Sequence, residues 1–184
     1  AGDFAAARSY HSQALALRRS QGDESGVAAS LNNLAVVDIF EGNYASAEVL
    51  LVGCLVISQR LANQRSIAMA MLNLGIVQTY TGRYCAAEES YATAIATYRA
   101  IGDRHSLGGA LGNLGDVLRY QGSLLRAQQM LQESLVILEE MSDPLGMAIT
   151  QNSLGRLRLA CHDAAQAADH FHTALTLAAR FGDP

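Results

Sequence analysis

Three asparagines recur at a fixed spacing of 40 residues, at Asn33, Asn73 and Asn113. An amide side chain both donates and accepts hydrogen bonds, so it matches a peptide group without reading the side chains of that peptide. A row of such amides could therefore hold the backbone of an extended chain. The alternative is that each asparagine forms its hydrogen bonds within the protein, and the sequence leaves both interpretations open.

Charged residues follow the third asparagine, at Asp116, Arg119 and Arg156. A guanidinium group can bind a carboxylate through two parallel hydrogen bonds, so both arginines are candidates for holding an acidic group. A solvated arginine, or an Arg156 neutralised by Asp116, agrees equally well with these residues.

Neither metal binding nor catalysis is indicated. His170 and His172 are two residues apart in a segment that we expect to be helical, so their side chains point in different directions. The three cysteines lack the paired spacing of a disulfide framework or a zinc site. Because the chain also has no nucleophile elbow and no phosphate loop, we expect no enzyme activity, no catalytic residue, no metal and no cofactor.

The candidate residues belong to a sequence that repeats every 40 residues without an insertion. Self-similarity at a fixed spacing over a whole chain is typical of a solenoid. The positions in register include two sets of apolar residues: Leu34, Leu74, Leu114 and Leu154, and Ala7, Ala47, Ala87, Ala127 and Ala167.

Each repeat predicts two helices separated by a break at a glycine such as Gly82. Asp23, Asn63, Asp103 and Asp143 stand where a side chain can cap the first helix of a repeat. We expect first helices at about 25–40, 64–80, 104–120 and 145–160, and second helices at about 44–61, 84–101, 124–141 and 164–181. We predict one array over 1–184, about nine helices in all, that is a fragment of a longer protein: 1–22 is the second helix of a truncated repeat, and full repeats span 23–62, 63–102, 103–142 and 143–182.

Composition narrows the class of partner. The formal net charge of −4 is mild and argues against nucleic acid, which requires a concentrated basic surface. The longest uncharged run covers 66–82, which is short and polar for a membrane span. We therefore expect no membrane contact. The cysteines, which lack a paired spacing, favour a reducing, cytoplasmic setting.

Several short segments carry a family resemblance. They are Leu-Asn-Asn-Leu-Ala at 31–35 and Asn-Leu-Gly at 73–75 and 113–115. A glycine and an alanine follow each of them, with an aromatic residue between these two in the first two cases and Leu124 in the third. These segments resemble the tetratricopeptide repeat. The 40-residue spacing is similar to its long-helix variety, as in kinesin light chain and in bacterial repeat-containing regulators. The resemblance implies an all-α, right-handed superhelical solenoid of antiparallel helix pairs.

The resemblance also implies a concave groove lined by the first helices. Its early part is apolar and its later part is polar, and we hypothesise that Gly109 and Gly112 open a pocket in its floor. The lysine-containing clamp of some family members is absent, because the chain has no lysine. The predicted groove residues are Asn33, Val36, Phe40, Leu72, Asn73, Ile76, Tyr80, Asn113, Asp116, Arg119, Tyr120, Asn152 and Arg156.

Three functions agree with this sequence. The first is a non-catalytic scaffold that binds a protein or peptide in the groove. The second is an effector-sensing or autoregulatory segment of a larger bacterial transcriptional or signalling regulator. The third is self-assembly through uncapped ends at Phe4 and Phe181.

Overall fold

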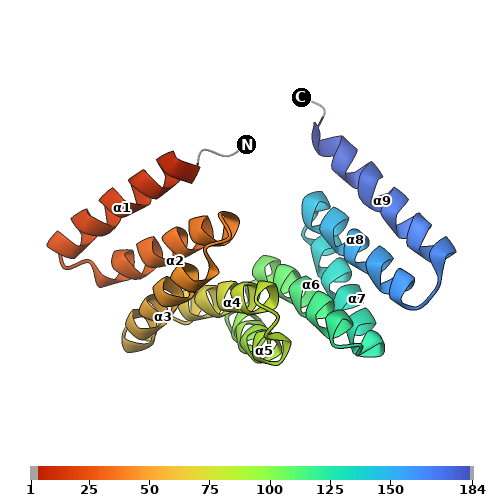
Figure 1. Cartoon of the computed structure of the whole chain (residues 1–184), viewed down its shortest axis with the longest axis horizontal. Coiled ribbons are helices and arrows are strands. Elements are labelled where there is room, and N and C mark those ends of the chain that lie inside the picture. The colour runs from red at the N-terminus through yellow and green to blue at the C-terminus, as the bar shows by residue number, and fades with distance from the viewer. Residues whose placement is uncertain (1–3, 183–184) are drawn as a thin grey trace. The chain divides into compact units, whose positions relative to one another are not determined.

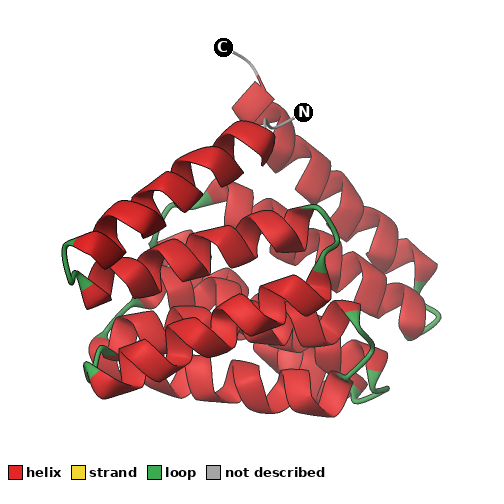
Figure 2. Ribbon diagram, turned by 60° about the vertical axis from the view of Figure 1, so that its left-hand side comes forward, coloured by secondary structure: helices red, strands yellow, loops and turns green. Residues whose placement is uncertain are grey.

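A computed structural model describes residues 4–182, with side chains up to residue 179. Over these residues the chain is all α-helical, joined by short turns (Figure 2), which confirms the predicted fold class. The helices are α1 (Phe4–Ser20), α2 (Glu24–Phe40), α3 (Tyr44–Arg60), α4 (Gln64–Tyr80), α5 (Tyr84–Ile101), α6 (Arg104–Tyr120), α7 (Leu124–Glu140), α8 (Pro144–Ala160) and α9 (Ala164–Gly182).

The helices begin and end where the repeat pattern predicts, to within about one residue for every full repeat. We call α2, α4, α6 and α8 the first helices, and α1, α3, α5, α7 and α9 the second helices. The domain limits of the individual repeats stay a prediction. The side chain of Phe181 lies outside the described residues.

The chain divides into two compact units, 1–97 and 98–184, and each is described by itself. In the first unit α2 packs against α1 and α3, and α3 also packs against α4 (Figure 1). In the second unit α7 packs against α6 and α8, and α8 also packs against α9. Within each unit successive first helices touch, because α2 contacts α4 and α6 contacts α8.

The predicted caps form at the start of all four first helices. Asp23 accepts a hydrogen bond from the backbone N–H of Gly26 at 2.9 Å, and Asp143 accepts one from Gly146 at 2.9 Å. Asn63 and Asp103 cap α4 and α6 in the same way. Each cap satisfies a backbone donor that has no partner inside the helix.

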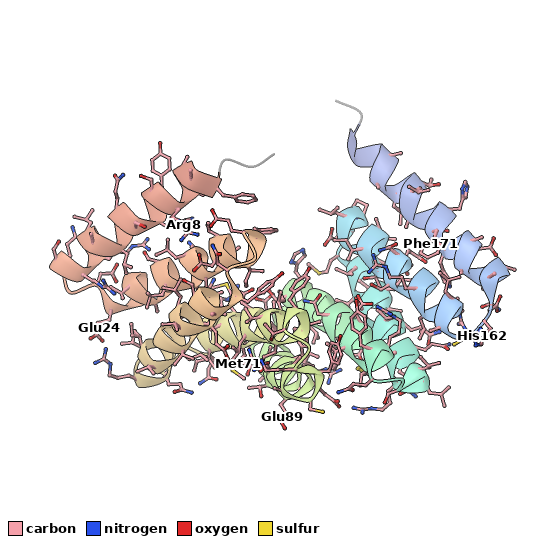
Figure 3. All side chains as sticks on the ribbon, in the orientation of Figure 1. Arg8, Glu24, Met71, Glu89, His162 and Phe171 are labelled. Carbon is pink, nitrogen blue, oxygen red and sulfur yellow. The ribbon has the colours of Figure 1, made fainter. Side chains whose placement is uncertain are left out.

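The core of each repeat depends on a small residue on the first helix that faces a large residue on the second. A Cβ atom on Gly75 would lie 2.6 Å from the ring of Tyr91, and one on Gly115 would lie 2.6 Å from Leu131. Gly155 and Phe171 meet in the same way in the last repeat. Figure 3 labels Phe171 on α9. The glycines therefore permit the two helices to pack closely. Cys54 is completely buried, as is Ala94, which occupies the same position in the next repeat.

In the part of the chain that the structure describes, no helix is long and apolar enough to cross a membrane.

Candidate functional site

The predicted groove residues of the first unit lie along α2 and α4. Val36, Leu72 and Ile76 are half-buried, whereas the side chains of Phe40 and Tyr80 are 68% and 66% exposed. Phe40 and Tyr80 occupy the same place in consecutive repeats, at the last residue of a first helix. The first helices therefore present apolar and aromatic side chains that their own packing does not cover.

Each exposed ring is held by a second ring from the preceding repeat. Phe4 at the start of α1 stacks on Phe40, with centroids 5.8 Å apart and an angle of 14° between the planes. Tyr44 at the start of α3 stacks on Tyr80, with 5.3 Å between centroids and an angle of 7°. A stacked pair contributes about 0.5–1.5 kcal/mol beyond its buried area. The rings are thus fixed in orientation while most of Phe40 and Tyr80 faces solvent.

A cavity of about 340 Å³ adjoins the first stacked pair, between α1 and α2. Asn33 and His11 are its polar groups, and neither side chain has a hydrogen-bond partner in the described part of the chain. The other lining residues are Phe4, Ala7, Val36, Val37 and Phe40. A pocket with an apolar lining and a few convergent polar groups is suited to binding.

Sequence reasoning missed the contribution of α1 to this cavity. His11 occupies the register of Leu51 and Tyr91, which are buried in the core of their repeats. A histidine at an apolar position of the repeat was the signal that could have indicated a site there.

The three asparagines of the predicted row have different environments. Asn33 is exposed, Asn73 is buried and Asn113 is half-buried. The Nδ2 group of Asn73 donates to Oδ1 of Asn32 at 2.9 Å, so this amide already serves the packing of α2 against α4. Asn73 and Asn113 belong to different units, and a continuous row through both of them stays a prediction.

Asp116 in the second unit forms its hydrogen bonds with residues other than Arg156. Asp116 is bound by Arg119 of its own helix, whose Nη2 donates to Oδ1 at 3.1 Å, and by the hydroxyl of Ser153, which donates to Oδ2 at 2.7 Å. The pairing of Arg156 with Asp116 is therefore wrong. Arg156 is exposed and has no ion-pair partner among the described residues.

Arg119 is consequently a poor candidate for binding a free carboxylate. Only 14% of its side chain is exposed, and its guanidinium carbon lies 4.3 Å from the centroid of the Tyr120 ring. The interactions with Asp116 and Tyr120 hold this arginine in place at the end of α6.

The two glycines predicted to open a pocket also differ. A Cβ atom on Gly109 would meet nothing within 4 Å, so this glycine faces open space. One on Gly112 would lie 3.4 Å from the hydroxyl of Ser134 and 3.7 Å from that of Thr150, so Gly112 belongs to the packing of α6 with α7 and α8. The hypothesis that both glycines open a pocket is therefore wrong for Gly112.

Asn152 lines an apolar cavity of about 400 Å³ between α8 and α9. Leu145, Ile149 and Leu175 around it are 52%, 61% and 70% exposed. The remaining lining residues are Ala148, Phe171, Ala174 and Ala178. This face of α8 and α9 is uncovered in the described part of the chain.

A larger cavity, of about 710 Å³, lies among the end of α5, the start of α6 and α7. Ion pairs join its walls: Arg99 contacts Glu133 at 2.5 Å, and Arg104 contacts Glu140. Because each cation here has its anion within the repeat array, the cavity offers a ligand no unpaired charge.

Buried and partly buried charges are paired elsewhere in the first unit. Asp38 is 1% exposed and accepts hydrogen bonds from Nη2 of Arg8 and from the hydroxyl of Ser46, both at 2.6 Å (Figure 3 labels Arg8). The hydrogen bond to Asp38 raises the pKa of the Arg8 guanidinium above its ordinary value. The hydrogen bonds from Arg83 lower the pKa of the Glu48 carboxyl.

In the second unit His170 lies beside α8. Its Nδ1 is 2.7 Å from the amide oxygen of Gln151, so Nδ1 carries the proton and donates it. Burial lowers the pKa of His170, the positive charge of Arg158 lowers it further, and Asp169 partly opposes both effects.

These observations agree with comparisons to known proteins. Two family models, each described as a tetratricopeptide repeat, match residues 66–140 and 27–66. The chain therefore belongs to the tetratricopeptide repeat family. No curated protein matches its sequence.

Solved structures share the fold at low identity. BtubC (BKLC) from P. vanneervenii is 22% identical with a TM-score of 0.80, over 100% of this chain and 76% of that chain. A putative kinesin light chain with TPR-like repeats from Podosopora anserina is 16% identical with a TM-score of 0.71, over 100% and 90%. The apo form of RapI is 14% identical with a TM-score of 0.73, over 96% and 77%. At these identities the similarity shows the fold alone.

Proposed function

We propose that this chain is a non-catalytic scaffold that binds an extended peptide or a partner segment across its first helices. The observation that carries the proposal is the pair of exposed rings, Phe40 and Tyr80, each held in place by a stacked partner from the preceding repeat. Fixed aromatic rings contribute apolar contact area at a small cost in side-chain entropy, because they are already ordered before binding. Membership of a family of interaction scaffolds supports the proposal.

The rest of the first-unit surface adds to this binding mode. Asn33 has a free amide beside Phe40, and it can bond to the backbone of a bound segment. Val36, Leu72 and Ile76 supply half-buried apolar side chains on the same two helices, α2 and α4. The binding energy would thus come from apolar contact, and the amide would orient the ligand.

The test begins with random peptides of about twelve residues displayed on phage and selected on the wild-type chain. The affinity of the strongest binder is then measured for Phe40→Ala and Tyr80→Ala. We expect each substitution to weaken binding by about tenfold or more, as truncation of a central aromatic contact does.

Val49→Ala is the matched control. Val49 is 72% exposed on α3, a second helix of the same unit, and its truncation should change the affinity by less than about twofold. If a selected peptide loses affinity for the Val49→Ala variant but binds the Phe40→Ala and Tyr80→Ala variants as it binds the wild type, the binding surface lies on the second helices. This result would contradict the proposal.

Self-association is a second candidate, and the apolar face of α8 and α9 favours it. Leu175 is 70% exposed beside the cavity lined by Ile149 and Phe171. If this face joins two copies, sedimentation velocity should show concentration-dependent association that Leu175→Glu abolishes. A monomer at every concentration would exclude it. A role as a sensing segment of a bacterial regulator rests on the family resemblance alone.

A further inference from the structure

One position near the end of each first helix bears a different residue in every repeat. It is two residues before the last residue of the helix and is occupied by Asp38, Gln78, Leu118 and Arg158. In three of the four repeats this side chain either forms hydrogen bonds with neighbouring side chains or is apolar and buried. Asp38 binds Arg8 and Ser46, Gln78 accepts a hydrogen bond from Ser90 at 2.7 Å, and Leu118 is completely buried among apolar groups.

Arg158 is the exception. Its Nε atom is buried without a hydrogen-bond partner, and it is the one side-chain nitrogen or oxygen in this condition within the described residues. Its two terminal nitrogens form no hydrogen bond either, yet they are not among the buried atoms, so they reach the surface. A partly buried guanidinium is unfavourable unless an anion compensates its positive charge, which is shared among its three nitrogens.

The fold supplies no such anion. In the first repeat, the charges around the buried position are Arg8 on the preceding second helix and Glu41 just after the first helix. The residues in register with these two around Arg158 are Gln128 and Cys161, neither of which is a carboxylate. No ion pair to Arg158 occurs in the described part of the chain.

The neighbouring residues leave the charge of Arg158 uncompensated. His170 donates its Nδ1 proton to Gln151 and so offers no acceptor to the guanidinium from that atom. Burial and, after it, the positive charge of Arg158 lower the pKa of His170 on α9. Asp169 follows on α9 but forms no ion pair with Arg158.

We propose that Arg158 is a binding site for a carboxylate of the partner, an aspartate or glutamate side chain that docks on its two terminal nitrogens. A guanidinium fork and a carboxylate have matching geometry, and their paired hydrogen bonds are stronger than neutral ones. Within this chain, the same position already uses a guanidinium–carboxylate pair, between Arg8 and Asp38, with the charges exchanged. The statement that the carboxylate belongs to a bound partner rests on the proposed function, whereas the binding of a carboxylate at Arg158 does not.

Arg158 is distinct from the groove residues predicted from the sequence, which include Arg156 but not Arg158. The two arginines are close in sequence on α8 but differ in surroundings, since Arg156 is exposed and Arg158 is half-buried beside α9. This difference provides a matched control on the same helix.

The test follows the Nε–Hε signals of arginines in the ¹⁵N-labelled full chain by NMR. The probes are the capped tripeptides acetyl-Gly-Glu-Gly-amide and acetyl-Gly-Gln-Gly-amide, which differ only in the carboxylate. We expect the Arg158 signal to shift and saturate with the glutamate peptide, with an affinity about tenfold or more above that for the glutamine peptide. The Arg156 signal should move in proportion to concentration without saturating.

Arg158→Gln should abolish the saturable binding, and Arg156→Gln should leave it within about twofold. Sodium acetate at equal ionic strength distinguishes a free carboxylate from a peptide-borne one, because a site adapted to a side chain binds the peptide more tightly. An unmoved Arg158 signal, equal shifts with both tripeptides, or tighter binding of acetate than of the glutamate peptide would overturn the proposal. These results would leave the aromatic contacts of the proposed function untouched, since Phe40 and Tyr80 lie in the other unit.

Discussion

Asp38 shows how single residues stabilise the joint between two repeats. It is a buried carboxylate on α2 that binds Arg8 from α1 and Ser46 from α3, so it links three helices. A buried charge is tolerated only where hydrogen bonds replace its hydration. Its role is therefore tied to the packing of the first unit and not to ligand binding.

Asp38→Ala should lower the free energy of unfolding by about 1–3 kcal/mol, because the hydroxyl of Ser46 then loses its acceptor and Arg8 keeps only Glu41. Urea denaturation followed by circular dichroism measures this change. Glu24→Ala is the control, since the Glu24–Arg60 pair is exposed and should contribute less than about 1 kcal/mol. Equal losses for the two variants would refute the structural role of Asp38.

His170 makes stability depend on pH. Its pKa in the folded chain is lowered by burial and by Arg158, whereas the unfolded chain takes up this proton near the ordinary value of 6.5. Because the unfolded state binds the proton first, stability is highest above about pH 6.5 and falls as the pH decreases through the folded pKa.

His170→Gln should remove this part of the pH dependence, and His172→Gln, at an exposed position of the same helix, should keep it. The measurement is the free energy of unfolding between pH 7.5 and pH 5, which spans about the range over which histidine titrates. An identical pH profile for wild type and His170→Gln would show that other groups cause the dependence.

At the scale of the elements, glycines in the first helices have opposite roles. Gly75 permits α4 to pack against the ring of Tyr91, whereas Gly109 on α6 faces open space. Gly75→Ala should destabilise the chain by about 1–3 kcal/mol, because the added methyl group would overlap the ring. Gly109→Ala should stabilise it by up to about 1 kcal/mol through helix propensity.

Thermal or urea unfolding of the two variants checks both signs. Both variants add the same methyl group to a helical glycine, so a difference in stability between them reports the surroundings of that methyl group. Destabilisation by Gly109→Ala would show that this glycine has a packing or conformational role that its surroundings do not reveal.

The helices could be predicted from the sequence because each repeat carries its own local signals. Asp23 and Asp103 mark helix starts, and Gly42 and Gly82 have positive φ at helix ends, as the repeat pattern indicates. At three equivalent ends the residue with positive φ is not glycine, and the turn still forms. At these three ends the packing of the repeats imposes a positive φ, although non-glycine residues disfavour it.

The candidate site was less predictable, since its residues depend on neighbours in other repeats. Asn73 is buried and bonds to Asn32 on the preceding first helix, whereas Asn33 is exposed, and the spacing of 40 residues does not distinguish the two. The pairing of Asp116 with Arg119 could have been recognised, because residues three apart on a helix face each other. The stacking of Phe4 on Phe40 joins two repeats, and no signal within either repeat indicates it.

For the molecule as a whole, the structure separates residues that maintain the array from residues that remain available for binding. The glycines, the capped helix starts and the buried ion pair belong to the first class. The exposed rings of Phe40 and Tyr80, the free amide of Asn33 and the unpartnered guanidinium of Arg158 belong to the second. An interaction scaffold requires both classes, and its repeats allow them to vary independently.

The most direct test of this account is to map a selected peptide on the chain by backbone amide chemical shifts. If the first helices form the binding surface, the largest shifts upon saturation should cluster on α2 and α4 around Val36, Phe40, Ile76 and Tyr80. Largest shifts on the second helices, around Val49 and Val56 on α3, would contradict the account.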